Sequence, residues 1–231
     1  MKSLRRSLLL MLACSTAWAW SLSDLTNKEA SGGLKQALEQ GANKAVSSLG
    51  KPDGFLLNKQ VKIPLPPRIA KAEKYIRLAG FGNQADELVL AMNRAAEAAV
   101  PEAKPLLLDA VKSMSVADAK QILTGGDDSV TQFFKAKTSD ALIQKFLPVV
   151  RKYTANVDLA KKYNRVAAQG LQLGLIKQED ADIDSYVARS ALDGVYKVIG
   201  QEEKAIRANP AAAVGSLARK VFGAIGESSG Q

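Results

Sequence analysis

The helical spacing of small apolar residues is the feature that most constrains the fold of this chain. Thirty-six of the 231 residues are alanine, runs of β-branched residues are few, and apolar side chains recur at i, i+3, i+4 and i+7. The clearest stripe, between residues 83 and 100, contains Ala85, Leu88, Val89, Met92, Ala95, Ala96 and Ala99. The pattern predicts an all-α fold whose small residues let neighbouring helices approach closely.

Signals for helix ends divide the chain into about eight to ten helices. Prolines suit first turns, glycines suit helix exits, and Ser115 with Asp118 resembles a capping box. Besides 83–100, the predicted helices are 34–49, 67–79, 101–113, 116–123, 128–136, 138–153, 158–173, 182–207 and 210–223. No linker or repeat separates them, so we expect one helical domain over residues 20–226 and a flexible tail at 227–231.

Residues 51–67 break the helical pattern. Pro52-Asp53-Gly54 is typical of a turn, and the apolar residues that follow alternate with polar or proline positions. The three prolines at 64, 66 and 67 exclude a central strand. We therefore expect a short, extended, proline-rich segment that forms either an edge strand or a strap across the helices.

The first 19 residues have the order of a secretory signal peptide. Three cations precede the apolar run 8–13, and Ala17-Trp18-Ala19 supplies an A-x-A cleavage site. The run is too short to span a membrane. We predict cleavage after Ala19 and a periplasmic location.

The chain has no histidine and one cysteine, Cys14, which lies inside the predicted signal peptide. A lipoprotein anchored through Cys14 is disfavoured, because the large Leu12 stands where a lipoprotein box usually has a smaller residue. The absence of histidine excludes Ser-His-Asp and Cys-His nucleophiles and His-ligated zinc. Cleavage after Ala19 removes the cysteine, which excludes disulfides. We predict no cofactor and no metal.

The formal net charge of +9 falls to +6 when the three cations of the predicted signal peptide are removed. The remainder is uneven: residues 20–80 carry +5, residues 81–130 carry −4, residues 131–178 carry +7 and residues 179–231 carry −2. Basic and acidic blocks can neutralise one another by packing together. The overall excess is therefore weak evidence for a polyanionic partner.

The strongest basic concentration is a candidate binding patch. Its members are Lys145, Arg151, Lys152, Lys161, Lys162 and Arg165, with Tyr153 and Tyr163 among them. Seven-residue and four-residue spacings place pairs of these cations on shared helix faces. Such a patch suits envelope lipid, lipopolysaccharide phosphates or an acidic protein, whereas nucleic acid is not expected for an exported protein. The alternative is a solvated face, or a face that packs on the acidic blocks.

Two other segments are candidate ligand sites. The loop Gly125, Gly126, Asp127 and Asp128 could present backbone N–H groups to an anion, although two carboxylates at a helix start also suit a structural turn. No Walker lysine follows, which excludes a nucleotide P-loop. Glu179, Asp180, Asp182 and Asp184 suit either a loose cation site or helix-start electrostatics; Ser185 and Ala191 exclude an EF-hand.

A carboxylate-based hydrolase acting on an envelope glycan is the enzymatic alternative. Its candidates are Glu73, Glu87, Glu97 and Glu102, of which Glu97 is the strongest, together with the Asp127/Asp128 loop. No pairing of these carboxylates follows from their spacing. A serine-lysine dyad fits only Ser48 and Lys51, and Gly50 interrupts the helix that such a dyad needs.

Short motifs spread along the chain resemble one known family. They are Ser23-Asp24-Leu25-Thr26-Asn27-Lys28 with Gly32-Gly33-Leu34, Gly50-Lys51-Pro52-Asp53-Gly54-Phe55-Leu56, Ile63-Pro64-Leu65-Pro66, Met92-Asn93-Arg94-Ala95-Ala96-Glu97, Leu123-Thr124-Gly125-Gly126-Asp127 and Ala191-Leu192-Asp193-Gly194. In combination, over about residues 21–223, they resemble the bacterial family known as domain of unknown function 4197. The resemblance implies an exported or envelope protein of proteobacteria, and it implies no catalytic residue because the family has no assigned activity.

The sequence thus favours a non-enzymatic envelope protein that binds an anionic or amphipathic partner. Binding would use the basic patch or a groove between alanine-rich helices. The hydrolase and a homo-oligomeric scaffold are the alternatives.

Overall fold

Helices account for most of the described residues in this computed structural model, which describes residues 26–126, 129–172 and 182–228. The α-helices are α1 (Asn27–Leu49), α2 (Pro67–Leu78), α3 (Gly82–Ala99), α4 (Ala103–Lys112), α5 (Val116–Thr124), α6 (Ser129–Thr154), α7 (Asp158–Gln172), α8 (Ile183–Ala208) and α9 (Ser216–Ser228). Two short 3-10 helices, η2 (Val100–Glu102) and η4 (Pro210–Ala212), join neighbouring helices. The described residues contain no strand, so the predicted all-α class is confirmed.

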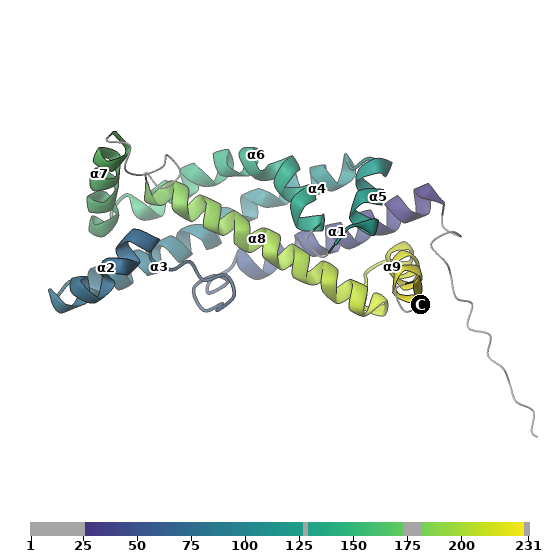
Figure 1. The fold of residues 1–231 in the computed structure, drawn as a ribbon, viewed down its shortest axis with the longest axis horizontal. Coiled ribbons are helices and arrows are strands. Elements are labelled where there is room, and N and C mark those ends of the chain that lie inside the picture. The colour runs from purple at the N-terminus through teal and green to yellow at the C-terminus, as the bar shows by residue number, and fades with distance from the viewer. Residues whose placement is uncertain (1–25, 127–128, 173–181, 229–231) are drawn as a thin grey trace, which may run out of the picture.

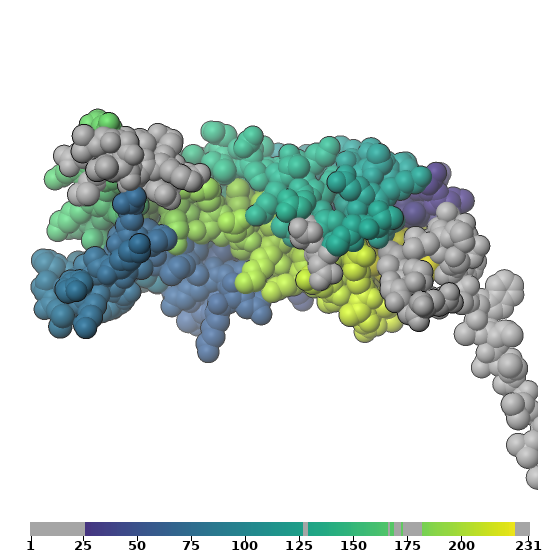
Figure 2. All heavy atoms as spheres, viewed as in Figure 1, coloured from purple at the N-terminus to yellow at the C-terminus, as the bar shows by residue number. Residues whose placement is uncertain are grey.

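The long helix α8 runs along the body and packs against α1 on one side and α6 on the other (Figure 1). Helix α3 packs mainly against α6, and α9 packs across α1 at one end of the molecule. Helices α2 and α7 lie at the opposite end (Figure 1). The space-filling view shows an elongated body, from which the α2 end projects (Figure 2).

Glycines of α1 allow two neighbouring helices to approach its backbone. A Cβ added to Gly33 would lie 2.5 Å from the carbonyl oxygen of Leu217 in α9, far closer than real contacts allow. A Cβ on Gly41 would meet Ile199 of α8 at 3.4 Å. The close approach predicted for small residues is therefore present at Gly33, whereas the contact at Gly41 would accommodate a Cβ at an ordinary van der Waals distance.

Three helices, α1, α6 and α9, differ clearly from the prediction, and α9 differs at both ends because it continues to Ser228 rather than ending at 223. Helix α1 begins at Asn27 rather than at residue 34, because Thr26 and Glu29 form a capping box. Hydrogen bonds from Lys220 and from Thr26 lower the pKa of Glu29 to about 2. Helix α9 begins at Ser216 rather than at 210, because η4 and Gly215, with φ of +112°, precede it.

The third difference concerns α6, which is continuous where two helices, 128–136 and 138–153, were predicted. The helix continues through the expected break: Lys135 and Lys137 are exposed on its outer side, whereas Thr138 is buried on its inner side. The hydroxyl of Thr138 donates to the carbonyl of Phe134 at 2.7 Å and lies 2.9 Å from the hydroxyl of Tyr196 in α8. This partner lies 58 residues away in the sequence, so local spacing could not reveal it.

Residues 51–66, which we call the strap, cross the helices without forming a strand. The edge-strand alternative is therefore wrong for this segment. Its apolar residues face the core: Phe55, Val61, Ile63 and Leu65 are all buried. Backbone amides of the strap donate hydrogen bonds to side chains of α3, where in a sheet they would donate to a neighbouring strand.

No helix in the described part of the chain combines the length and the apolar character that a membrane span requires.

Candidate functional site

Asn93 of α3 holds the second half of the strap by its backbone. Its side-chain oxygen accepts from the amide of Ile63 at 2.9 Å, and its amide nitrogen donates to the carbonyl of Ile63, also at 2.9 Å. The same nitrogen donates to the carbonyl of Val89 at 2.8 Å. Asn93 is fully buried, and these bonds give it a complete structural role.

Glu97, the strongest candidate for a catalytic carboxylate, holds the first half of the strap. Its Oε1 accepts from the amides of Phe55 and Leu56, both at 3.0 Å. Its Oε2 accepts from Arg94 at 2.7 Å, and Arg94 also binds Asp53 at 2.8 Å. We call Asn93, Arg94 and Glu97 the clamp.

The apolar side chains of the strap also pack closely against a helix. Phe55 lies over Gly194 of α8, where an added Cβ would come within 2.7 Å of the ring and 3.4 Å of Val61. Glycine at 194 therefore makes room for the strap. The motifs around residues 54, 63, 93 and 194 thus meet in one structural contact, although 140 positions separate the outer two in the sequence.

The other carboxylates considered for hydrolysis do not join Glu97. Glu73 pairs with Arg77 within α2 at 2.8 Å, and Glu87 and Glu102 are exposed. Asp53 is linked to Glu97 only through Arg94, next to a hollow of about 220 Å³ that Tyr153 also lines. Both carboxylates therefore hold the strap, and nothing in this geometry favours the hydrolase.

The described half of the Gly125, Gly126, Asp127 and Asp128 loop is a tight turn. A Cβ on Gly125 would lie 2.6 Å from the carbonyl oxygen of Gln121, so this position needs glycine for packing. Ser129 and Arg207 both donate to the carbonyl of Ile122 at 3.1 Å, which satisfies the end of α5. Asp127 and Asp128 lie outside the described residues. These contacts favour the structural-turn alternative.

The acidic cluster is likewise used by the fold where it is described. Asp182 caps α8 by accepting from the amide of Ser185 at 2.6 Å. Asp184 accepts from the hydroxyl of Thr154 at 2.6 Å and lies 3.6 Å from Arg151. Glu179 and Asp180 lie outside the described residues. Within the described ranges, no group of three or more carboxylates is placed to hold a metal ion.

The predicted basic patch is divided between two helices. Lys145, Arg151 and Lys152 are exposed on α6, and Lys161, Lys162 and Arg165 are exposed on α7. The last turn of α6 contains Arg151 and Lys152, where cations offset the helix dipole, and Arg151 pairs with Asp184. Helix α7 turns away to pack on α3 and α8. Its cations therefore have different neighbours from those of α6.

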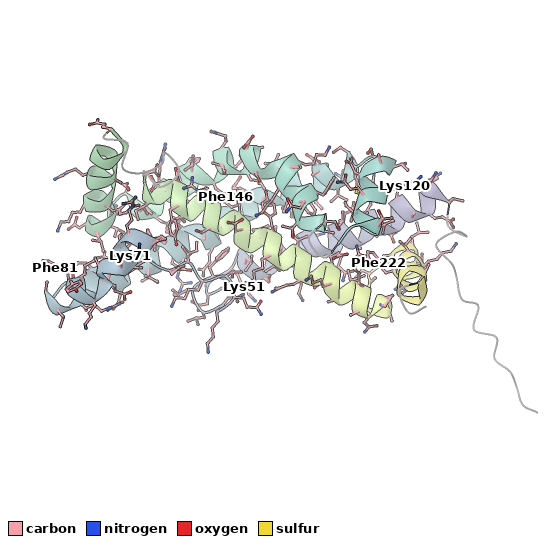
Figure 3. All side chains as sticks on the ribbon, viewed as in Figure 1. Lys51, Lys71, Phe81, Lys120, Phe146 and Phe222 are labelled. Atoms are coloured by element: carbon pink, nitrogen blue, oxygen red, sulfur yellow. The ribbon has the colours of Figure 1, made fainter. Side chains whose placement is uncertain are left out.

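Helix α2 supplies further cations next to those of α7. Its outer face follows the spacing i, i+3, i+7 and i+10 with Arg68, Lys71, Tyr75 and Leu78, and Lys74 lies on the same face. A pocket of about 460 Å³ between the helices is lined by Arg68 and Lys71 of α2, Tyr163 of α7 and Tyr186 of α8. Figure 3 shows Lys71 on α2 beside this region. We call α2 and α7 together the basic end.

Charge is one-sided at the basic end. The two helices contain seven cations and two carboxylates, Glu73 and Asp158. Glu73 pairs with Arg77, and Asp158 lies 3.8 Å from Lys161. Among the described residues, no carboxylate forms an ion pair with Lys71, Lys74 or Arg165. Unlike the clamp, this surface keeps positive charge at Lys71, Lys74 and Arg165 that no described carboxylate neutralises.

The turn between α2 and α3 exposes large apolar side chains at the same end. Tyr75 is 72% exposed, Leu78 is 75% exposed and Phe81 is 49% exposed. We call these three residues the tip. Lys162 of α7 lies 5.7 Å from the centre of the Phe81 ring, which links α7 to the tip. Figure 3 shows Phe81 at the extreme end of the molecule.

Sequence reasoning did not identify the outer face of α2 as a candidate site, although the helical spacing of its cations and apolar residues is present in the sequence. Ile69 and Ile76 form a second apolar stripe on the opposite side of α2, and Ile69 is the buried one. Two apolar stripes on one short helix do not reveal which side faces the core. Only the packing of α2 on α3 shows that Tyr75 and Leu78 point outward.

The comparisons with known proteins identify a family without naming an activity. Residues 24–223 match the family described as "Protein of unknown function (DUF4197)", so the chain belongs to that family. The predicted resemblance is confirmed. Comparison with curated proteins and with solved structures found no significant match.

Proposed function

We propose that this protein is an exported, non-enzymatic envelope protein that binds an anionic partner through its basic end. The observation that carries the proposal is the concentration of seven cations against two carboxylates on α2 and α7. The fold pairs two of these cations, Arg77 and Lys161, with carboxylates, much as it pairs Arg94 in the clamp. Several remain exposed and unpaired by described carboxylates, which favours an external anion.

Export is supported by the N-terminal order of charge, apolar run and small residues, which lies outside the described residues. Expression of the full chain in a bacterial host, followed by mass spectrometry of the envelope fraction, tests this part. The expected product begins at Trp20. Recovery of the uncleaved chain from the cytoplasm would contradict export.

Binding is tested by neutralising the α7 cations with Lys161→Gln, Lys162→Gln and Arg165→Gln in one variant. At low salt, binding to lipopolysaccharide and to anionic vesicles should fall on the order of a hundredfold, at roughly 1 kcal/mol for each cation near the surface. Binding by the unmodified protein should also weaken as salt rises. Circular dichroism and urea unfolding confirm that the variant folds.

The matched control neutralises three exposed cations elsewhere: Lys51→Gln and Lys59→Gln in the strap and Lys120→Gln in α5. Figure 3 places Lys51 and Lys120 away from the basic end. This control loses the same net charge and should bind almost as well as the unmodified protein. Equal loss in both variants would show a dependence on net charge alone, and no loss in either would remove the proposal.

A further inference from the structure

The exposed apolar residues of the tip are concentrated rather than scattered. Single exposed apolar residues are ordinary on a soluble protein, but grouped ones mark interaction sites. Of the large apolar side chains exposed in the described residues, Tyr75, Leu78 and Phe81 lie within seven positions of one another. They occupy the end of the helical hairpin that α2 and α3 form, and Figure 3 shows Phe81 at that end of the molecule.

The face that bears the tip is amphipathic along its length. Lys71 and Lys74 precede Tyr75 and Leu78 on the outer side of α2, so charge lies nearer the body and apolar area lies nearer the end. Lysine stems can lie along an apolar surface while the ammonium group remains in water. Tyrosine favours a membrane interface because its ring is apolar and its hydroxyl is polar.

The hairpin is braced so that the tip keeps its position. Arg77 binds Glu73 at 2.8 Å within α2 and Asp86 of α3 at 2.6 Å. The second Arg77–Asp86 bond measures 3.2 Å, which makes the contact bidentate. Arg77 therefore ties the exposed helix to α3 just behind Leu78.

We propose that the tip inserts into the surface of an anionic phospholipid bilayer, with the cations of α2 and α7 on the lipid headgroups. This inference rests on the proposed function and deepens it by naming the partner and the mode of contact. Charge complementarity decides the occupant: a neutral apolar groove of a protein would leave Lys71, Lys74 and Lys162 without counter-charges. An anionic leaflet offers both headgroup charge and an apolar layer within a few ångströms.

The test replaces the two most exposed tip residues, Tyr75→Gln and Leu78→Gln, in one variant. The matched control is Leu57→Gln with Val214→Gln, whose native side chains are 72% and 69% exposed away from the tip. Binding is measured by co-sedimentation with vesicles of phosphatidylglycerol and phosphatidylethanolamine at about 0.15 M salt. The tip variant should bind at least about tenfold more weakly. The control should bind like the unmodified protein.

Depth of insertion gives a second readout that electrostatic binding alone does not change. A Cys14→Ser background removes the only native thiol, so Leu78→Cys or Leu57→Cys can carry one environment-sensitive fluorophore. The probe at 78 should shift to the blue on anionic vesicles and be quenched by brominated acyl chains. The probe at 57 should do neither.

The outcomes separate this inference from the proposed function. Loss of binding in the α7 variant with an unchanged tip variant and an unquenched probe would overturn insertion and leave anion binding intact. Unchanged binding in both variants would overturn both. Tip-dependent self-association in sedimentation, or tip-dependent binding to lipopolysaccharide but not to phospholipid, would assign the surface to a different occupant and overturn the inference as well.

Discussion

The clamp and the basic end are both attached to α3, and they treat polar groups in opposite ways. In the clamp, Asn93 and Glu97 are buried, and their hydrogen bonds go to the strap or to α3 itself. At the basic end, Lys71 and Lys74 are exposed beside Tyr75 and Leu78. The first arrangement stabilises the fold, whereas the second exposes charge and apolar area that folding does not require.

This difference separates the two kinds of residue that a sequence motif can contain. Met92-Asn93-Arg94-Ala95-Ala96-Glu97 has the polar composition of an active site, yet its contacts account for each of its charged and amide groups. The α2 face has no catalytic composition, yet Lys71 and Lys74 form no ion pair with a described carboxylate, and Tyr75 and Leu78 are exposed. We therefore assign a structural role to the first region, and we propose binding only for the second.

The largest expected effect comes from Glu97→Ala in the clamp. It leaves the buried amides of Phe55 and Leu56 without an acceptor, and the free energy of unfolding should fall by about 3 kcal/mol. Urea unfolding measures this loss. Glu102→Ala, on an exposed carboxylate five residues further on, should change stability by less than about 0.5 kcal/mol. A stable Glu97→Ala protein would break the comparison and return Glu97 to the catalytic candidates.

The next largest effect tests the apolar packing of the strap on α8. Gly194→Ala places a Cβ 2.7 Å from the Phe55 ring and should cost about 1–3 kcal/mol of stability. Adding Phe55→Leu should recover part of that loss, because it removes the atoms that collide. Gly223→Ala in α9 is the control, since no atom lies within 4 Å of its added Cβ. If both alanine variants were equally stable, the strap would not be held tightly at Gly194.

The clamp also shows how far the sequence alone can lead. The helical stripe through Met92 and Ala96 predicts α3 almost to the residue, and i, i+4 spacing places Asn93 and Glu97 on one side. Their partners lie 30 and 42 residues earlier, in a segment with no regular hydrogen-bond pattern. Local spacing cannot identify such partners, so Glu97 was a candidate catalytic carboxylate until the structure placed it against the strap.

The basic patch shows the complementary weakness of sequence reasoning. Counting charge along the chain identified Lys161, Lys162 and Arg165 but grouped them with cations of α6. The fold instead places Lys162 beside Phe81, about 80 residues earlier in the sequence. A patch is defined by neighbouring helices, and neighbours in space follow from packing rather than from spacing.

A smaller effect concerns the contact between Arg77 and Asp86 behind the tip, and it depends on pH. Hydrogen bonds from Arg77 hold the pKa of Asp86 below its ordinary value of 3.8. A lowered pKa in the folded state stabilises the contact above the ordinary value, and this stabilisation is lost as pH falls through the folded-state value. Hydrogen-exchange protection in α2 should therefore decrease only when the pH falls below the ordinary value of 3.8.

In Asp86→Asn, the hydrogen-exchange protection of α2 should already be reduced at neutral pH. The free energy of global unfolding should change little. Asp109→Asn, which removes the exposed 3.7 Å pair with Lys112 in α4, is the matched control. Its α2 protection should follow the unmodified protein at every pH. If Asp86→Asn and the unmodified protein behaved alike, Arg77 would not brace the hairpin.

The smallest expected effect on stability is the most informative about the tip. Tyr75→Gln with Leu78→Gln removes two large side chains, but both are more than two-thirds exposed, so the free energy of unfolding should change by less than about 0.5 kcal/mol. Urea unfolding of the tip variant and of Glu97→Ala, measured side by side, compares the two changes in the free energy of unfolding directly. A tip loss of more than about 1 kcal/mol would place Tyr75 and Leu78 among the residues that hold the fold together. A neutral result combined with weakened vesicle binding means that these apolar side chains serve a surface outside the protein, because nothing inside it depends on them.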